Sequence, residues 1–311
     1  MSETTALLPD SSERSQDPFA QTANDRFDDA VTEHTRRPRV THLLGPLRRP
    51  TVIAATVWLV VVAIAALAPS LLAPGDPFLG VPADKLQPPS LEHWFGTDQI
   101  GRDLYTRVVH GASLTLSAAA VAVAVGILVG AGLGLVAGFS GGRVDDLIMR
   151  AADVLLAIPG LLLSLAIITA LGFGTVNVAI AVGAASIASV ARIMRSEVLR
   201  VRSSPYIEAA YTSGNRWVRV LGRHVLPNAV GPVIVLAVLE LGGAILAVSA
   251  LSFLGYGAQP PLAEWGSLVA AGRDYLRYAW WLTTFPGIVI ALTVLAAHRL
   301  SRALDSNRSA R

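Results

Sequence analysis

Long stretches without a charged residue constrain this chain more than any other feature of its sequence. Asp, Glu, Lys and Arg are missing from five intervals: Thr51–Gly75, Gly111–Gly142, Val154–Ala191, Leu241–Ala263 and Ala279–Ala297. A helix needs roughly 20 residues to cross a hydrocarbon core of about 30 Å, and each interval is long enough to do so. The whole chain is 53% hydrophobic and only 15% charged, too apolar for an ordinary soluble domain. The chain is therefore predicted to be a membrane protein.

The apolar intervals divide into six predicted spans. The interval beginning at Val154 is too long for one helix, and the glycine-containing segment Leu171–Asn177 supplies a turn within it. The predicted spans are Val52–Ala73, Ser113–Phe139, Asp153–Ala170, Val176–Met194, Ala229–Leu251 and Trp281–Leu300. The predicted fold class is an all-α membrane protein, a six-span helical bundle.

Three regions follow from this division. Residues 1–45 are polar and lack apolar periodicity, which predicts a disordered cytoplasmic tail rather than a secretory signal. Residues 46–110 hold the first span and an extracytoplasmic segment, and residues 111–311 form the core domain with spans 2–6 and a loop at 197–227.

The basic residues predict which side of the membrane each segment occupies. With both termini in the cytoplasm, 20 of the 25 lysines and arginines lie inside. The five in outer segments are Lys85, Arg102, Arg107, Arg273 and Arg277. Positive charge concentrates on the cytoplasmic side of membrane proteins, so this distribution predicts cytoplasmic termini. It also explains the isoelectric point of about 9.6 without any nucleic-acid partner.

The basic loop between the fourth and fifth spans is predicted to form two short helices. Ser204 and Pro205 favour a helix start, and Gly214 favours its end. A second helix would follow as far as Pro227. Small residues at Ala209 and Ala210 would let another protein approach closely, although an amphipathic loop lying on lipid headgroups is the alternative.

Several ordered motifs in the chain are similar to those of one transporter family. The spacing Glu208-Ala209-Ala210, three residues, Gly214, nine residues and His224–Pro227 resembles the EAA loop of permeases in ATP-binding-cassette (ABC) importers. The branch that imports dipeptides, oligopeptides and nickel is similar in further motifs, and its second ("C-type") permease resembles this chain most. These motifs are Phe95–Leu104, Ala157–Pro159, His224–Asn228, Phe253–Gly257 and Trp280–Gly287.

The resemblance implies a function and a set of partners. It implies a permease subunit in the bacterial inner membrane, importing peptides with a homologous permease, two ATPase subunits and an extracytoplasmic solute-binding protein. The residues implied to couple to the ATPases are Glu208, Ala209, Ala210, Gly214, Leu226 and Pro227. Nickel chelates and glutathione-like thiols stay open as cargo.

The sequence excludes a P-loop ATPase site in this chain, so any ATP hydrolysis must come from a partner chain. A P-loop needs a lysine after glycine, and the single lysine, Lys85, follows Asp84 in an outer segment. ATP and magnesium are therefore expected on partner ATPases. There is no cysteine, and six scattered histidines form no ligand-like pair, so neither a catalytic residue nor a metal site is expected.

Two intramembrane features invite a functional or a structural interpretation. Glu240 is the one acid deep within a span, where an unpaired charge is costly; it is a candidate for the translocation pathway or for a structural hydrogen bond. Gly126, Gly130, Gly134 and Gly138 recur every four residues, which predicts close helix packing within the subunit or a sliding contact with a partner permease.

The outer segment before the second span is predicted to be an amphipathic surface helix. Asp98 with Arg102 and Asp103 with Arg107 have the i,i+4 spacing of helical ion pairs. Asp98, Arg102, Glu264 and Trp265 are candidates for contact with the solute-binding protein, and a salt-bridged surface helix is the plainer interpretation.

Two other classes of protein remain as alternatives. A secondary transporter driven by an ion gradient would usually show paired intramembrane charges or broken helices in related repeats, and a membrane scaffold would need no coupling loop.

Overall fold

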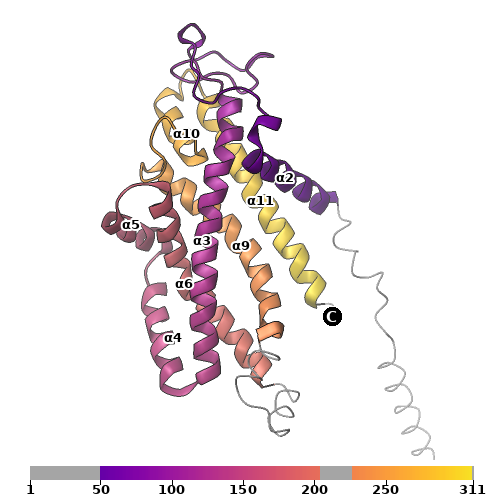
Figure 1. Cartoon of the computed structure of the whole chain (residues 1–311), viewed down its shortest axis with the longest axis vertical. Helices are drawn as coiled ribbons and strands as arrows, with labels where there is room; N and C mark the ends of the chain where they lie inside the picture. The colour runs from indigo at the N-terminus through magenta and orange to yellow at the C-terminus, as the bar shows by residue number, and fades with distance from the viewer. Residues whose placement is uncertain (1–49, 204–225, 310–311) are drawn as a thin grey trace, which may run out of the picture. The chain divides into compact units, whose positions relative to one another are not determined.

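The structure, a computed structural model, describes residues 50–203 and 226–309 (Figure 1). The predicted tail at 1–45 and most of the predicted coupling loop lie outside these residues. Long helices dominate the described part: α2 (Pro50–Leu67), α3 (Leu104–Ser140), α6 (Thr175–Arg202), α9 (Leu226–Phe253) and α11 (Trp281–Ser309). Shorter elements connect them: η4 (Pro69–Leu71), η5 (Pro82–Asp84), α4 (Gly142–Leu156), α5 (Gly160–Leu171), α10 (Trp265–Gly272) and η7 (Arg273–Tyr275).

The helices confirm the predicted fold class. Five are long and apolar enough to cross a membrane, and α4 with α5 supplies a sixth span if the pair counts as one. Across residues 50–203 and 226–309 there is no strand, only two isolated β-bridges in the segment before α3.

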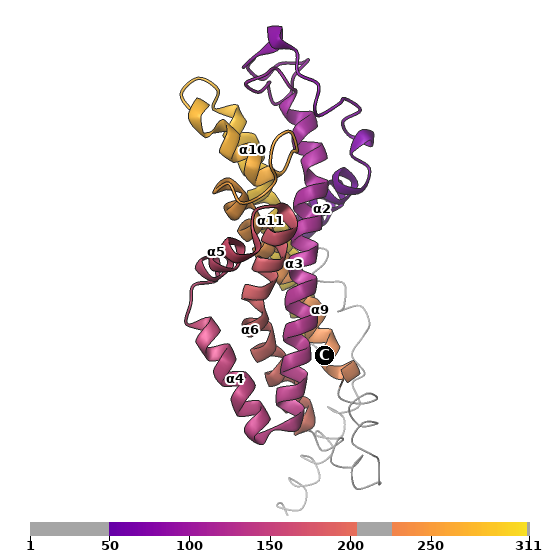
Figure 2. The same ribbon diagram turned by 60° about the vertical axis from the view of Figure 1, so that its left-hand side comes forward.

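The third predicted span, Asp153–Ala170, is wrong as a continuous helix. It divides into α4 and α5, which meet at an angle of 94° across Ala157–Pro159. A proline inside a helix removes a backbone donor and clashes with the preceding turn, which favours the end of α4 before Pro159. Figure 2 shows α5 turning away from α4 beside α6.

The glycine stripe of α3 packs inside this chain, against α6. A Cβ built on Gly130 would lie 2.7 Å from the Ile187 carbonyl oxygen, and one built on Gly138 would lie 2.9 Å from the Val198 Cβ. Gly126 and Gly134 meet Ser186 and Ala191 in the same way. The packing interpretation of the stripe is confirmed, because only glycine allows the two backbones to lie so close.

The predicted turn between the third and fourth spans is also confirmed. Gly172 and Gly174 adopt left-handed φ angles of 89° and 127°, which side chains other than glycine rarely adopt. The Asn177 side chain donates hydrogen bonds to the carbonyl oxygens of Leu171 and Gly172 at 3.0 and 3.1 Å. These bonds close the turn and fix the start of α6.

Ion pairs fasten α4 to α6. Arg195 forms a two-pronged pair with Asp145 at 2.5 and 2.6 Å, and Arg192 pairs with Asp153. The Asp145–Arg195 pair was not foreseen from the sequence. A bidentate guanidinium–carboxylate pair fixes the relative orientation of the two side chains. The pair therefore holds α4 alongside α6, although the chain changes direction after α4, at Pro159.

Candidate functional site

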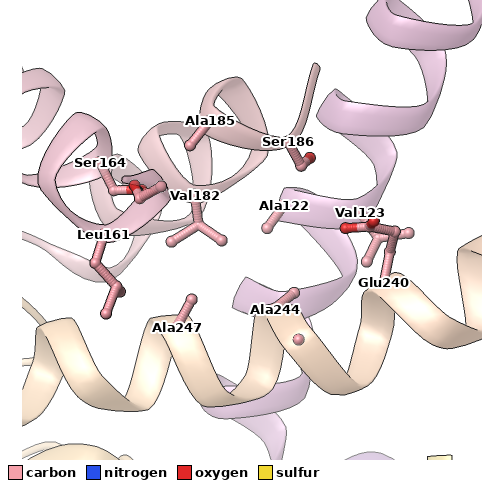
Figure 3. A pocket seen from close by; sticks show the side chains of 12 residues that line it. Ala122, Val123, Leu161, Ser164, Val182, Ala185, Ser186, Glu240, Ala244 and Ala247 are labelled. Atoms are coloured by element: carbon pink, nitrogen blue, oxygen red, sulfur yellow. The ribbon is translucent and has the colours of Figure 1, made fainter. Parts of the chain in front are cut away.

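A cavity opens among four helices near the middle of the bundle. It has a volume of about 200 Å³ and lies between α3, α5, α6 and α9. Figure 3 shows Glu240 of α9 beside Ala122 and Val123 of α3, with Leu161 and Ser164 of α5 on the opposite side. The acid that the sequence singled out therefore faces a cavity, as its pathway interpretation requires.

Small residues form most of the cavity wall. Alanine, glycine or serine supplies eight of its twelve lining positions: Ala122, Gly160, Ser164, Ala185, Ser186, Gly243, Ala244 and Ala247. A Cβ atom built on Gly160 or on Gly243 would meet nothing within 4 Å, so the space directly beside both residues is open. The cavity thus exists because the facing helices carry short side chains at these positions.

The segment before α3 differs from its prediction. Residues 98–102 form an irregular hook rather than a helix, and Gly96 and Gly101 have left-handed φ angles of 75° and 81°. The Asp98–Arg102 pair is confirmed, with Arg102 Nε 2.7 Å from Asp98 Oδ2. The second predicted pair is wrong: Arg107 lies 3.7 Å from Asp98, not beside Asp103.

Asp103 has a structural role instead. Its Oδ1 accepts a hydrogen bond from the Thr106 amide at 2.7 Å and caps the first turn of α3. Its Oδ2 lies 3.0 Å from Nδ1 of His93. A side chain that caps a helix start faces the orphan amides there, which explains why Asp103 does not reach Arg107 one turn later.

Glu264 and Trp265 lock α10 onto α3. Glu264 caps α10, accepting hydrogen bonds from the amides of Gly266 and Ser267 at 3.1 and 3.0 Å, and Thr115 of α3 donates to the same carboxylate at 3.1 Å. The Trp265 indole donates to the Val108 carbonyl oxygen at 2.9 Å. Burial raises the pKa of the Glu264 carboxyl, and these hydrogen bonds oppose the shift.

The four outer candidates for contact with a binding protein are buried in the structure, and that contact stays a prediction. Asp98 and Arg102 are 4% and 8% exposed, and Glu264 and Trp265 are 0% and 1% exposed. Their side chains point into the protein because each satisfies a buried partner. They shape the outer surface but do not present side chains on it in this conformation.

The coupling residues remain a prediction. Glu208, Ala209, Ala210 and Gly214 lie outside the described residues. Leu226 and Pro227 form the first turn of α9, the helix that carries Glu240. The predicted contact with an ATPase is therefore continuous in sequence with a helix that lines the cavity.

The apolar spanning helices mark the chain as a multi-pass membrane protein, and four of its helices surround a cavity lined by one acid. Comparison with known proteins gives the family. Residues 130–309 match the family described as "Binding-protein-dependent transport system inner membrane component". The chain belongs to this family.

Its relatives are named as permeases. The chain is 41% identical to the dipeptide transport system permease protein of Alkalihalophilus pseudofirmus, over 72% of this chain and 73% of the relative. It is 40% identical to the probable D,D-dipeptide transport system permease protein of Escherichia coli K12, over 79% and 83%. It is 38% identical to the glutathione transport system permease protein of Pectobacterium atrosepticum, over 83% and 86%. The chain is accordingly a transport component and not an enzyme.

Proposed function

We propose that this chain is one permease subunit of an ABC importer that brings dipeptides or oligopeptides into a bacterial cell. The observation behind the proposal is the identity of 41% and 40% to proteins named as dipeptide permeases, over most of both chains. Helices α3 and α6, packed through glycines, would form the scaffold of the permease. The cavity that α3, α6 and α9 share would form part of the translocation pathway.

The other subunits of the transporter follow from this assignment. A homologous permease would complete the path, and two ATPase subunits would bind ATP and magnesium below it. An extracytoplasmic binding protein would deliver cargo to the outer surface that Asp98, Arg102, Glu264 and Trp265 hold in shape. The basic residues clustered at the α3–α4 turn and at the end of α6 support cytoplasmic termini: Arg143, Arg150, Arg192, Arg195, Arg200 and Arg202.

Helix α9 offers a direct mechanical link between ATPase and path. It runs without a break from Leu226 to Phe253. At a rise of about 1.5 Å per residue, Glu240 lies about 21 Å along the axis from Leu226. A displacement of Glu208–Pro227 would therefore be transmitted along this helix to the cavity wall.

Complementation tests the assignment. A host strain lacking this gene should lose most uptake of radiolabelled alanyl-alanine, and a plasmid copy should restore it. Unchanged uptake in a strain without other dipeptide carriers would refute the peptide assignment.

Glutathione import is the second candidate, because a relative at 38% identity is named as a glutathione permease. In the same strains, excess unlabelled glutathione should leave alanyl-alanine uptake intact if dipeptides are the cargo. If the strain lacking this gene loses uptake of labelled glutathione but keeps dipeptide uptake, the second candidate is favoured.

A further inference from the structure

The chemistry of the central cavity indicates which end of a cargo it would hold. Glu240 is the one charged residue among the twelve that line the cavity. Among the side chains that the structure describes (residues 50–203, 233 and 235–304), none donates a hydrogen bond or an ion pair to its half-buried carboxylate. An acid inside a span needs a cation, a proton or water as a partner. The described part of the chain supplies no cation to this one.

The two hydroxyl groups on the wall cannot replace that cation. Ser186 donates its proton to the Gly183 carbonyl oxygen at 2.9 Å, and Ser164 donates to the Gly160 carbonyl oxygen at 2.9 Å. Their oxygens are left as acceptors. Because the other lining side chains are aliphatic or hydrogen, the wall offers acceptors and apolar surface but no charged donor.

The dimensions suit one end of a small molecule. A volume of 200 Å³ is below the roughly 300–1,000 Å³ of pockets that enclose a drug-sized ligand. Ala247 lies two helical turns beyond Glu240 on α9, about 10 Å along the axis. A charged group at Glu240 would thus leave room for a short apolar portion along Ala244 and Ala247 (Figure 3).

We propose that this cavity binds the protonated amino group of the cargo, with Glu240 as its counter-charge, while the apolar wall takes the adjoining side chain. The inference rests on the proposed function and adds a requirement for a free amino terminus. An ammonium group carries three donors and no acceptor, the complement of this wall. A divalent metal fits less well, since it would need several oxygen or nitrogen ligands, and the described residues hold no group of three acidic, histidine or cysteine side chains placed to bind one.

Uptake by the complete transporter in proteoliposomes tests the proposal, with one binding protein used throughout. Glu240→Gln should lower uptake of alanyl-alanine at least about tenfold, the usual effect of losing a charge-assisted hydrogen bond. The same variant should leave uptake of N-acetyl-alanyl-alanine unchanged, however slow that uptake is. Asp146→Asn removes an exposed acid from α4 and is the matched control; it should alter neither rate.

Two results would overturn the inference while leaving the importer intact. If Glu240→Gln lowers the uptake of both peptides by the same factor, the residue has a structural role. No change for either peptide would mean that Glu240 does not meet the cargo. If the wild-type complex takes up neither peptide, the proposed function has failed, and the labelling experiment below then decides the inference alone.

Covalent labelling gives a second measurement that does not depend on transport. A carbodiimide should activate the Glu240 carboxyl, and bound alaninamide should attack it, forming an amide bond and releasing the carbodiimide as a urea. Mass spectrometry should find this adduct on Glu240 in the wild-type complex, with none on Glu240 when N-acetyl-alaninamide is used. Absence of the alaninamide adduct would contradict the proposal.

Discussion

At the scale of single residues, buried charges organise the outer end of the protein. Asp98 accepts hydrogen bonds from the amides of Ile100 and Arg102, both at 3.0 Å, and forms an ion pair with Arg102. Arg107 lies close to it and donates to the Pro77 carbonyl oxygen at 2.9 Å. One carboxylate thus neutralises part of the charge of two buried arginines. Asp98 is the residue on which the hook at 98–102 depends.

Replacing Asp98 with Asn should destabilise the folded subunit strongly. Two arginines that are 8% and 4% exposed would lose their common counter-charge. Breaking a buried ion pair costs about 3–5 kcal/mol. SDS-induced unfolding of the purified subunit should show a loss of that order in the free energy of unfolding.

Asp274→Asn is the control, because its ion pair with Arg273 is exposed. Exposed pairs contribute about 0–1 kcal/mol. Equal effects of the two substitutions would contradict the role given to Asp98.

The buried carboxyl of Glu264 should make stability depend on pH. Burial raises its pKa in the folded protein above the ordinary value of 4.5, so the folded state binds more protons than the unfolded state above pH 4.5. This contribution therefore makes the free energy of unfolding fall as pH rises from about 4.5 to the raised pKa. Unfolding measured across that window in the wild type and in Glu264→Gln should show a steeper fall in the wild type. Parallel pH profiles would show that Glu264 does not titrate in this window.

Sequence reasoning at this scale found the residues but not all of their partners. The spacing of Asp98 and Arg102 predicted their pair, although they lie in a hook and not in a helix. The same rule failed for Asp103 because α3 begins at Leu104 and Asp103 caps it. Gly96 and Gly101 were the available signal, since glycines on both sides of Asp98 favour a turn over a helix.

At the scale of elements, α3 and α6 pack together more extensively than any other two helices of the described part. The stripe from Gly126 to Gly138 was readable in the sequence because its period of four places every member on one helix face. Its partner was not readable, because many helices could pack on such a stripe. The break between α4 and α5 had a signal in Pro159-Gly160, which a continuous apolar run concealed.

A bulky residue in the stripe should separate α3 from α6. Gly130→Val would place side-chain atoms against the Ile187 carbonyl and the Val190 side chain. Overpacking of this kind costs about 1–3 kcal/mol, and backbone contact allows little relief. The yield of folded subunit and its melting temperature in detergent should both fall.

Gly132→Val on the same helix is the matched control, since a Cβ there would meet nothing within 4 Å. Similar losses in both variants would mean that glycine matters for α3 itself and not for its contact with α6.

At the scale of the whole molecule, the proposed role of the chain is to receive force from partner ATPases and not to generate it. The outer surface and the cavity belong to the described part, and Leu226 begins the helix that would join the cavity to the ATPases. The fold class and the family could be predicted from the sequence, since apolar length and ordered motifs are local. The cavity could not, because it depends on short side chains that four separate helices bring together.

Substitution in the predicted coupling loop should separate ATP hydrolysis from transport. Glu208→Lys reverses the charge near the start of the predicted coupling helix, so the contact with the ATPase should weaken. Peptide uptake by the reconstituted complex should fall about tenfold or more, a loss of about 1.4 kcal/mol in coupling, while ATP hydrolysis continues. Full uptake in this variant would place the coupling contact elsewhere.

The energy source of uptake tests the central claim most directly. Right-side-out membrane vesicles that contain the complete transporter can be loaded with ATP or given a proton gradient, and labelled alanyl-alanine uptake measured in each. Internal ATP should drive accumulation when the binding protein is present, and collapse of the proton gradient should leave it unchanged. Accumulation that follows the proton gradient and ignores internal ATP would contradict this account.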